Sequence, residues 1–287
     1  RTTLRARDPK KVVAQIKHLR ENYGIRQVMF YDDTFTVLKK TCLEFCEALA
    51  AEKLDVSWVA YVRGDCFNDE LAAAMHKAGC HQVLMGIETG SDAIALRIGK
   101  PITRNRYIEA VRIAHRHGME VRGSFIIGSM GETWETMLET LHFAIELDVD
   151  LFQLSISTPY PGTALYKEAK ESGSLKECSW YEFGQGKVLV QQSQISDEEI
   201  FRFERYAFRK FYLRPIVAWR MLKRLTRLRQ IRDYCVTAMI LLLGRHKKKD
   251  ERDWESWKDL IEEDYFDIAI VEPANTPLTY QLRQEQN

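Results

Sequence analysis

Strand-like and helix-like segments alternate along the first 175 residues, and this alternation limits the possible folds more than any other feature. Five short apolar segments have the length and composition of strands: 27–31, 57–61, 82–87, 120–127 and 151–157. Helical patterns lie before, between and after them, at 8–24, 38–53, 69–78, 103–117, 133–147 and up to Ser172. Strands separated by helices predict a parallel sheet with right-handed crossovers.

The carboxyl end of each predicted strand is polar or rich in glycine, whereas the middle of each strand is apolar. Asp32 and Asp33 follow the first strand, for example, and Glu88 follows the third. An open doubly wound sheet would gather such residues at one switch point, whereas a barrel gathers them from all its strand ends. We therefore expect an α/β fold of the TIM-like barrel type.

The alternation of strand and helix patterns ends at about residue 175, and the distribution of charge changes after it. Ser196 and Glu199 have the spacing of a capping box, which predicts the start of a helix. Residues 201–250 carry 15 basic and three acidic side chains, and residues 251–287 carry three basic and ten acidic ones. We expect three regions: a barrel core at 1–175, an extension packing on the barrel at 176–215, and a basic helical region with an acidic tail at 216–287.

The overall composition is that of an ordinary globular protein. Of the 287 residues, 45% are apolar and 29% are charged, and the formal net charge is +1. These values argue against a disordered, collagen-like or transmembrane chain and against a protein that coats nucleic acid. The six cysteines are scattered and no signal peptide precedes them, which predicts reduced thiols in the cytoplasm.

Two acidic strand ends are candidates for binding a polar ligand. Glu88 is followed by Thr89, Gly90 and Ser91, whose hydroxyls and open backbone could hold hydroxyl or ammonium groups. The structural alternative is a plain turn with a solvated Glu88. The pair Asp32-Asp33 could bind a cation, a metal or an ammonium group, or Asp33 could simply cap the next helix.

Two turns at the ends of the fourth and fifth strands are also candidates. The apolar segment 123–128 ends at a glycine, and its open backbone could bind the edge of an adenine ring. Its alternative is ordinary turn chemistry, with Glu132 favouring the amino end of the next helix. The segment 158–163 contains two prolines, which predicts a rigid turn. This turn could shape the mouth of a pocket, or it could be purely structural.

Taken together and in this order, these segments resemble the radical S-adenosylmethionine (SAM) superfamily. The matching stretches are Phe-Tyr-Asp-Asp-Thr-Phe-Thr at 30–36, Gly-Ile-Glu-Thr-Gly-Ser at 86–91, Gly-Ser-Phe-Ile-Ile-Gly at 123–128, Gly-Glu-Thr at 131–133 and Thr-Pro-Tyr-Pro-Gly-Thr at 158–163. The subgroup most resembled binds cobalamin and includes anaerobic magnesium-protoporphyrin monomethyl ester cyclase and hopanoid-modifying enzymes. The resemblance implies a partial (β/α)6 barrel that holds strands two to six and lacks the first.

The resemblance also implies which residues bind the cofactor. The positions that match are Asp32, Asp33, Arg63, Glu88, Ser91, Ile126 and Gly128. The two aspartates occupy the stretch beside the methionine amino group of SAM. The next three fall where the family contacts the ribose or the carboxylate, and the last two lie on the adenine-binding strand.

The family's chemistry follows from the same resemblance. A [4Fe-4S] cluster supplies one electron for reductive cleavage of SAM, and the resulting 5′-deoxyadenosyl radical abstracts a hydrogen atom from the substrate. In this subgroup cobalamin takes part in methyl transfer or oxidative cyclisation. We expect a small-molecule substrate, such as a lipid or a tetrapyrrole, and an electron donor such as flavodoxin or ferredoxin.

One element of the family pattern is missing from the sequence. Radical SAM enzymes bind the cluster through a Cys-x3-Cys-x2-Cys loop after the first strand. Cys42 and Cys46 have the first spacing, but position 49 is Leu49, and both cysteines lie in a predicted helix as packing residues. We expect the cluster loop and any cobalamin domain to lie upstream of Arg1, and this chain to be inactive by itself.

Two other functions fit the same residues. A metal-dependent TIM-barrel lyase or hydrolase would use Asp32, Asp33 and Glu88, and a non-catalytic remnant would bind SAM without redox chemistry. The basic segment 216–249 has the pattern of an amphipathic helix, which suits either an anionic membrane surface or docking on the barrel. We expect a cytoplasmic protein without a nucleic-acid partner. Peripheral contact of 216–249 with the inner membrane surface is one alternative, and docking of this segment on the barrel, paired with the acidic tail, is the other.

Overall fold

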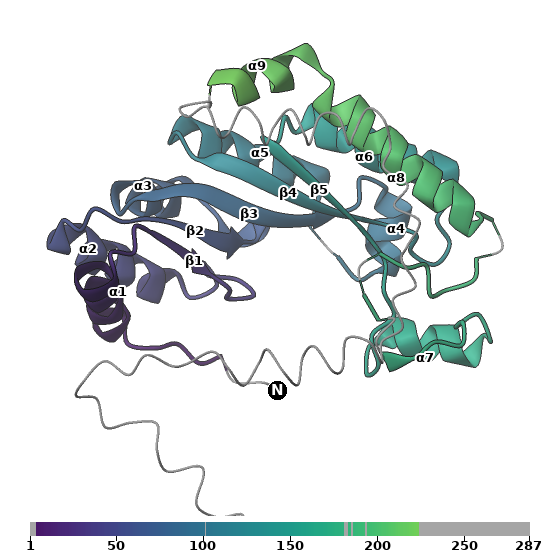
Figure 1. Ribbon diagram of the computed structural model, residues 1–287, viewed down its shortest axis with the longest axis horizontal. Coiled ribbons are helices and arrows are strands. Elements are labelled where there is room, and N and C mark those ends of the chain that lie inside the picture. Colours follow the sequence, from purple (N-terminus) through teal and green to yellow (C-terminus); the bar gives the residue numbers. More distant parts are fainter. Residues whose placement is uncertain (1–3, 101, 181–182, 185, 193, 224–287) are drawn as a thin grey trace, which may run out of the picture. The chain divides into compact units, whose positions relative to one another are not determined.

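The computed structural model describes residues 4–223, except 101, 181–182, 185 and 193. Its five strands form one parallel sheet in the order β1-β2-β3-β4-β5 (Figure 1). The strands are β1 (Gln27–Phe30), β2 (Ser57–Val62), β3 (Cys80–Glu88), β4 (Glu120–Ile127) and β5 (Leu151–Ile156). Each strand pairs with the next one along the chain, so the strand order never reverses its direction across the sheet. A doubly wound sheet has such a reversal. The parallel α/β fold is confirmed, and the strand order is that of a barrel segment.

The helices that connect the strands lie on one face of the sheet. Each right-handed crossover advances by one strand in the same direction, which places successive helices on the same side; Figure 1 shows α3, α5 and α6 there. The helices are α1 (Pro9–Tyr23), α2 (Lys39–Glu52), α3 (Asp69–Lys77), α4 (Asp92–Arg97), α5 (Arg104–Arg116), α6 (Trp134–Glu146), α7 (Ala164–Glu171), α8 (Asp197–Tyr212) and α9 (Pro215–Lys223), with a 3₁₀ turn η1 (Gly64–Cys66).

Local capping chemistry explains where two of these helices begin. The Asp8 carboxylate accepts a 2.9 Å hydrogen bond from the Lys10 amide, and Pro9 occupies the first helical position of α1. At α8, the amide of Glu199 donates to the Ser196 hydroxyl, and the Glu199 carboxylate accepts from the Ser196 amide at 2.8 Å. The capping box predicted from the sequence is therefore confirmed.

The core fills the space between the sheet and its helices. On β4, Val121, Phe125 and Ile127 are fully buried against the helices, whereas Ser124 and Ile126 point to the opposite, inner face and are only half-buried. This alternation along one strand shows that the inner face is the part-open side of the sheet. The helix side therefore supplies packing, and the inner face and strand ends remain for ligands.

The helix α8 covers the outer edge of the sheet at β5. The Phe211 ring stacks on Phe152 with centroids 4.9 Å apart, and the Tyr212 hydroxyl bonds both the amide and the carbonyl of Phe152. A side chain thus satisfies backbone groups that an edge strand would otherwise leave unpaired.

The predicted basic segment 216–249 lies mostly outside the described residues, of which α9 is the last element. The acidic tail lies outside them altogether. None of the helices found between residues 4 and 223 combines the length and the apolar character required for crossing a bilayer.

Candidate cofactor-binding site

The carboxyl ends of the five strands meet at one edge of the sheet. Neighbouring strands end in register, as the pairs Phe30–Ala60, Val62–Met85 and Ile126–Ser155 show. The loops that leave the strands therefore start from the same edge, where a barrel places its active site. All the residues that the sequence singled out lie at or next to this edge: Asp32, Asp33, Arg63, Glu88, Ser91, Ile126 and Gly128.

The turn after β3 has an unusual backbone. Glu88 has a φ of +70°, and the Thr89 amide bonds the Ile87 carbonyl at 3.0 Å, closing a three-residue turn around Glu88. This conformation is costly for a residue with a side chain and tends to occur where function requires it. The Glu88 carboxylate accepts a 2.7 Å hydrogen bond from Lys100 and its side chain is only 20% exposed. The alternative of a solvated Glu88 in a plain turn is therefore wrong.

Two helices hold the same turn from behind. The Thr140 hydroxyl on α6 accepts a 3.0 Å bond from the Gly90 amide and pairs with the Thr89 hydroxyl at 3.0 Å. Arg104 on α5 donates to the Gly90 carbonyl at 2.7 Å. A Cβ at Gly90 would lie 2.5 Å from the Glu139 carbonyl oxygen, so only glycine fits this close approach to α6.

Ser91 connects this turn to α4, a helix that the sequence patterns did not predict. Its side chain is buried, and its amide donates to the Thr89 hydroxyl at 3.1 Å. Lys100 follows α4 in the chain, and its ammonium group donates a hydrogen bond to the Glu88 carboxylate. The short α4 therefore positions the cation that orients the Glu88 carboxylate.

Arg63, at the end of β2, already has a partner. Its guanidinium bonds both carboxylate oxygens of Asp65, at 3.1 and 2.6 Å, and these bonds lower the pKa of Asp65. Tyr107 on α5 packs behind this turn against Gly64 and donates to the Gly86 carbonyl at 3.2 Å. Burial raises the pKa of Tyr107, so its hydroxyl acts as a hydrogen-bond donor.

The Asp32–Asp33 turn after β1 is far more open. Both aspartates are exposed, and within residues 4–223 no side chain is found bonded to either carboxylate. Asp32 borders a cavity of about 240 Å³ that Arg5 and Arg7 also line. The alternative role for Asp33 as a helix cap is wrong, because α2 begins only at Lys39.

The turn after β4 is closed by a buried acid. Glu132 is 0% exposed; one carboxylate oxygen accepts a 2.7 Å bond from the Ser129 amide, and the other has no partner in the described part of the chain. Burial raises the pKa of Glu132 to about 7. The Gly128 carbonyl accepts from the Gln192 side chain at 2.6 Å. Thr133 caps α6, and Glu132 directly precedes this cap, so its carboxylate lies in the turn that leads into the helix.

The cysteines of α2 belong to the core. Cys42 and Cys46 are 3% and 2% exposed, which confirms them as packing residues. A hydrogen bond with Cys42 and burial raise the pKa of the Cys46 thiol. Across the described ranges, no set of three His, Cys, Asp or Glu side chains has the arrangement of a metal site.

Sequence reasoning missed several residues that position the site: Lys100 and Arg104, and also Tyr107 and Thr140. Tyr107 and Thr140 lie on the buried faces of α5 and α6, at helical spacing from Ala110 and Ala144 respectively. A polar side chain at a core position of a helix was the available signal, since a buried hydroxyl needs a bonding partner. The helical pattern could not show that the hydrogen-bond partners of these hydroxyls lie at the end of β3 and in the loop after it.

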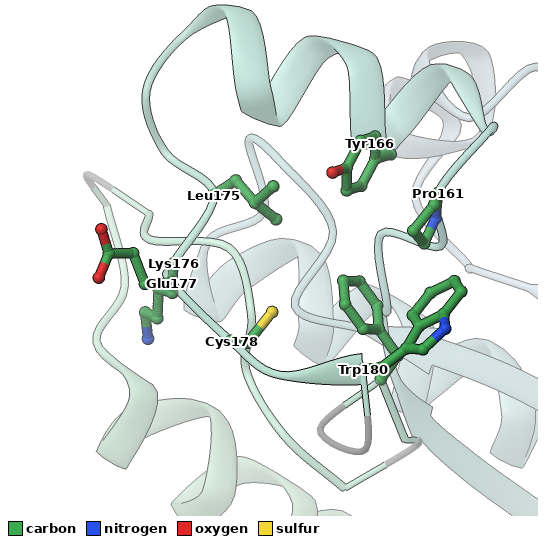
Figure 2. Close-up of a pocket in the computed structure, with 8 residues that line it drawn as sticks. Pro161, Tyr166, Leu175, Lys176, Glu177, Cys178 and Trp180 are labelled. Carbon is green, nitrogen blue, oxygen red and sulfur yellow. The ribbon is translucent and has the colours of Figure 1, made fainter.

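A second cavity lies beyond β5, in the loops around α7 (Figure 2). Pro161, from the proline-rich turn at 158–163, lines it, which agrees with a role of this turn at a pocket. Its other walls come from α7 and from the segment that follows α7.

Comparison with known proteins shows which family this chain belongs to. The pattern of the radical SAM superfamily matches residues 1–144. An uncharacterized methyltransferase of Pyrococcus horikoshii is 38% identical over 213 residues, which are 74% of this chain and 46% of the relative. The anaerobic magnesium-protoporphyrin IX monomethyl ester cyclase of Cereibacter sphaeroides is 29% identical over 214 residues, covering 73% of this chain and 35% of the cyclase. The chain thus spans less than half the length of these curated relatives.

A solved structure has the same fold. The radical SAM methyltransferase TsrM from Kitasatospora setae, determined with cobalamin and a [4Fe-4S] cluster bound, matches with a TM-score of 0.54 and 18% identity. The match covers 67% of this chain and 39% of TsrM, and at this identity it concerns the fold alone. Because the family pattern spans half of the chain and a relative is 38% identical over 74% of it, the chain belongs to the radical SAM superfamily.

Proposed function

We propose that this chain is the SAM-binding core of a radical SAM enzyme that carries out methyl transfer or oxidative cyclisation together with cobalamin. The observation that carries the proposal is the convergence of polar strand ends at one edge of a parallel sheet, in a chain of this family. When bound, SAM and a [4Fe-4S] cluster would supply the radical chemistry of the superfamily. The protein's own residues would bind and orient the reacting groups.

The donors and acceptors at the strand ends fit the polar groups of SAM. The exposed carboxylates of Asp32 and Asp33 are suited to hold the ammonium group of the methionine moiety. Glu88, held by Lys100 at 2.7 Å, is suited to accept hydrogen bonds from ribose hydroxyls. The half-buried Ile126 side chain and the backbone at Gly128 offer an apolar surface and hydrogen-bonding groups to a flat adenine ring.

The backbone of the site supports this orientation. A Cβ at Gly86 would lie 2.6 Å from the Glu88 carboxylate, so the absence of a side chain there leaves room for the carboxylate to fold over β3. Thr140 and Arg104 hold the next residues of the turn in place. These contacts would present Glu88 to a ligand in one fixed direction, which limits the entropy lost on binding.

The described residues do not fit a [4Fe-4S] cluster. Such a cluster needs cysteine thiolates close together, and the buried Cys42 and Cys46 are packing residues without a third ligand at the required spacing.

For the substrate, we propose a small organic molecule such as a tetrapyrrole or a lipid. The similarity to a cyclase named for magnesium-protoporphyrin supports the first of these. A small electron-transfer protein such as flavodoxin or ferredoxin would supply the electron in the complete enzyme.

The proposal is tested by measuring SAM binding to the chain by isothermal titration calorimetry. We expect a saturable heat for the wild type and a loss of about tenfold or more in affinity for Asp33→Asn, since a charge-assisted hydrogen bond contributes about 1.5–3 kcal/mol. Glu21→Gln, which removes an exposed acid on α1, is the matched control and should bind as the wild type does. No binding of SAM, or equal losses in the two variants, would contradict the proposal.

A further inference from the structure

An aromatic pocket lies at the end of β5 in the same loop layer as the candidate site. Its volume is about 350 Å³, at the small end of the range for ligand pockets. The apolar part of the lining consists of Pro161, Tyr166, Leu175, Cys178, Trp180 and Phe183. Figure 2 shows Tyr166 and Trp180 on different sides of the pocket, with Pro161 on one flank and Leu175 on the other.

The ring of Phe183 lies within contact range of two other aromatic rings of this pocket. The Trp180 and Phe183 centroids are 5.5 Å apart with the rings at 88°, and the Tyr166 and Phe183 centroids are 6.5 Å apart. Trp180 nevertheless remains 71% exposed, a large apolar surface left in water. A further flat ring placed against Trp180 would remove that surface from solvent and add a stacking contact.

The charged residues of the lining do not offer a free charge to the interior. Lys176 is paired with Asp197 at the start of α8. Figure 2 shows the Glu177 carboxylate directed away from the pocket. An anionic ligand would need an available cation, and an ammonium ligand is best held when a carboxylate completes the ring of aromatics. The lining therefore favours a neutral ligand.

Hydrogen bonds and an ion pair attach the pocket to the loops of the candidate SAM site. Arg97 on α4 pairs with Glu168 on α7. The Thr158 hydroxyl at the end of β5 donates to the Gly184 carbonyl at 3.4 Å. Because α4 directly follows Ser91, a ring held in the pocket would lie over the same edge of the sheet as the cofactor residues.

We infer that this pocket binds a neutral, flat aromatic ring of the substrate, stacked on Trp180 and Tyr166. The inference rests on the proposed function, because it assigns the pocket to the substrate of the SAM-dependent reaction.

The test uses the chain labelled with 5-fluorotryptophan and ¹⁹F nuclear magnetic resonance. The sequence has six tryptophans, and the resonance lost in Trp180→Phe identifies Trp180. The neutral probe is 2-naphthol, and tetramethylammonium is the cationic one. We expect 2-naphthol to shift the Trp180 resonance in a saturable way and tetramethylammonium to leave it unchanged. No saturable shift with 2-naphthol, or a shift with the cation instead, would overturn the inference.

Matched variants separate stacking from general loss of structure. Tyr166→Ala should weaken 2-naphthol binding about tenfold, whereas Tyr166→Phe, which keeps the ring, should bind as the wild type does. Tyr23→Ala removes a tyrosine that is 60% exposed on α1 and should have no effect. Equal affinities in Tyr166→Ala and the wild type would also overturn the inference. SAM calorimetry on the same samples distinguishes the two proposals, because SAM binding without 2-naphthol binding contradicts this inference alone.

Discussion

The turns after β3 and β1 carry acidic residues at equivalent places but are built in opposite ways. At the β3 turn, Lys100 bonds Glu88, while Thr140 and Arg104 bond Gly90 from two different helices. At the β1 turn, Asp32 and Asp33 are exposed, and the Thr34 hydroxyl bonds only the backbone carbonyl of Asp33, at 2.7 Å. The fold holds one acidic strand end in a fixed orientation, whereas the other is exposed to solvent.

This difference shows that a carboxylate at a barrel strand end can be oriented in advance by the fold or left free in solvent. Glu88 takes a left-handed backbone conformation that the surrounding bonds must stabilise. In the described part of the chain no such bond is found on Asp32 or Asp33, so their carboxylates are hydrated and available to a cation. Substitutions of the residues that hold the β3 turn, Gly90 and Thr140, should therefore act on stability, and those in the β1 turn on binding.

The largest effect is expected for Gly90→Ala. The new methyl group would lie 2.5 Å from the Glu139 carbonyl oxygen and 2.6 Å from the Phe143 Cβ, so the turn and α6 must separate. We expect a loss of about 3–4 kcal/mol in the free energy of unfolding, measured by urea denaturation. Gly184→Ala is the control, since a Cβ added there would have no atom within 4 Å of it. Equal stabilities of the two variants would show that the β3 turn is not tightly packed.

Glu132 extends the comparison to the turn after β4. Its pKa rises from 4.5 to about 7 on folding, so the folded state binds its proton more tightly than the unfolded state does. Its contribution to stability is therefore lost as the pH rises from about 4.5 to about 7, by up to about 3 kcal/mol. We expect Glu132→Gln to remove this part of the pH dependence. Urea denaturation at a series of pH values should give a wild-type curve steeper than the variant's, and parallel curves would refute the assignment.

Thr140→Val tests the hydrogen bonds that fix the β3 turn. The substitution leaves the buried Gly90 amide without its acceptor, which should lower the free energy of unfolding by about 2 kcal/mol. Thr140→Ser keeps the hydroxyl and loses only a methyl group, so its stability should fall clearly less. Hydrogen exchange should locate the change at the Gly90 amide; an unchanged exchange rate there would contradict the role assigned to Thr140.

The smallest effect on stability is expected for Asp32→Asn and Asp33→Asn. Both side chains are exposed, so each variant should change the free energy of unfolding by less than about 0.5 kcal/mol. The same urea denaturation measures them beside the Gly90 and Thr140 variants. A loss comparable to that of Thr140→Val would mean that the β1 turn is also held by its carboxylates, and the comparison between the two turns would fail.

Much of the fold could be predicted from local patterns. The five strands end within two residues of their predicted bounds, because each apolar run stops at polar or glycine residues. The short α4 and η1 were missed, since six and three residues are too few to show a helical period. The polar strand ends predicted the edge at which the candidate site gathers, because parallel strands in register must place their carboxyl ends at one edge.

The sequence by itself determined the alternation of strands and helices, the edge at which the candidate site gathers, and the match to the radical SAM family. Only the tertiary structure decided which of the acidic side chains are engaged. Lys100 is 12 residues from Glu88, and Thr140 is 50 residues from Gly90, so no local period links them. Whether a carboxylate is paired, buried or open depends on which helix packs behind its turn, and that packing is settled by the whole core at once.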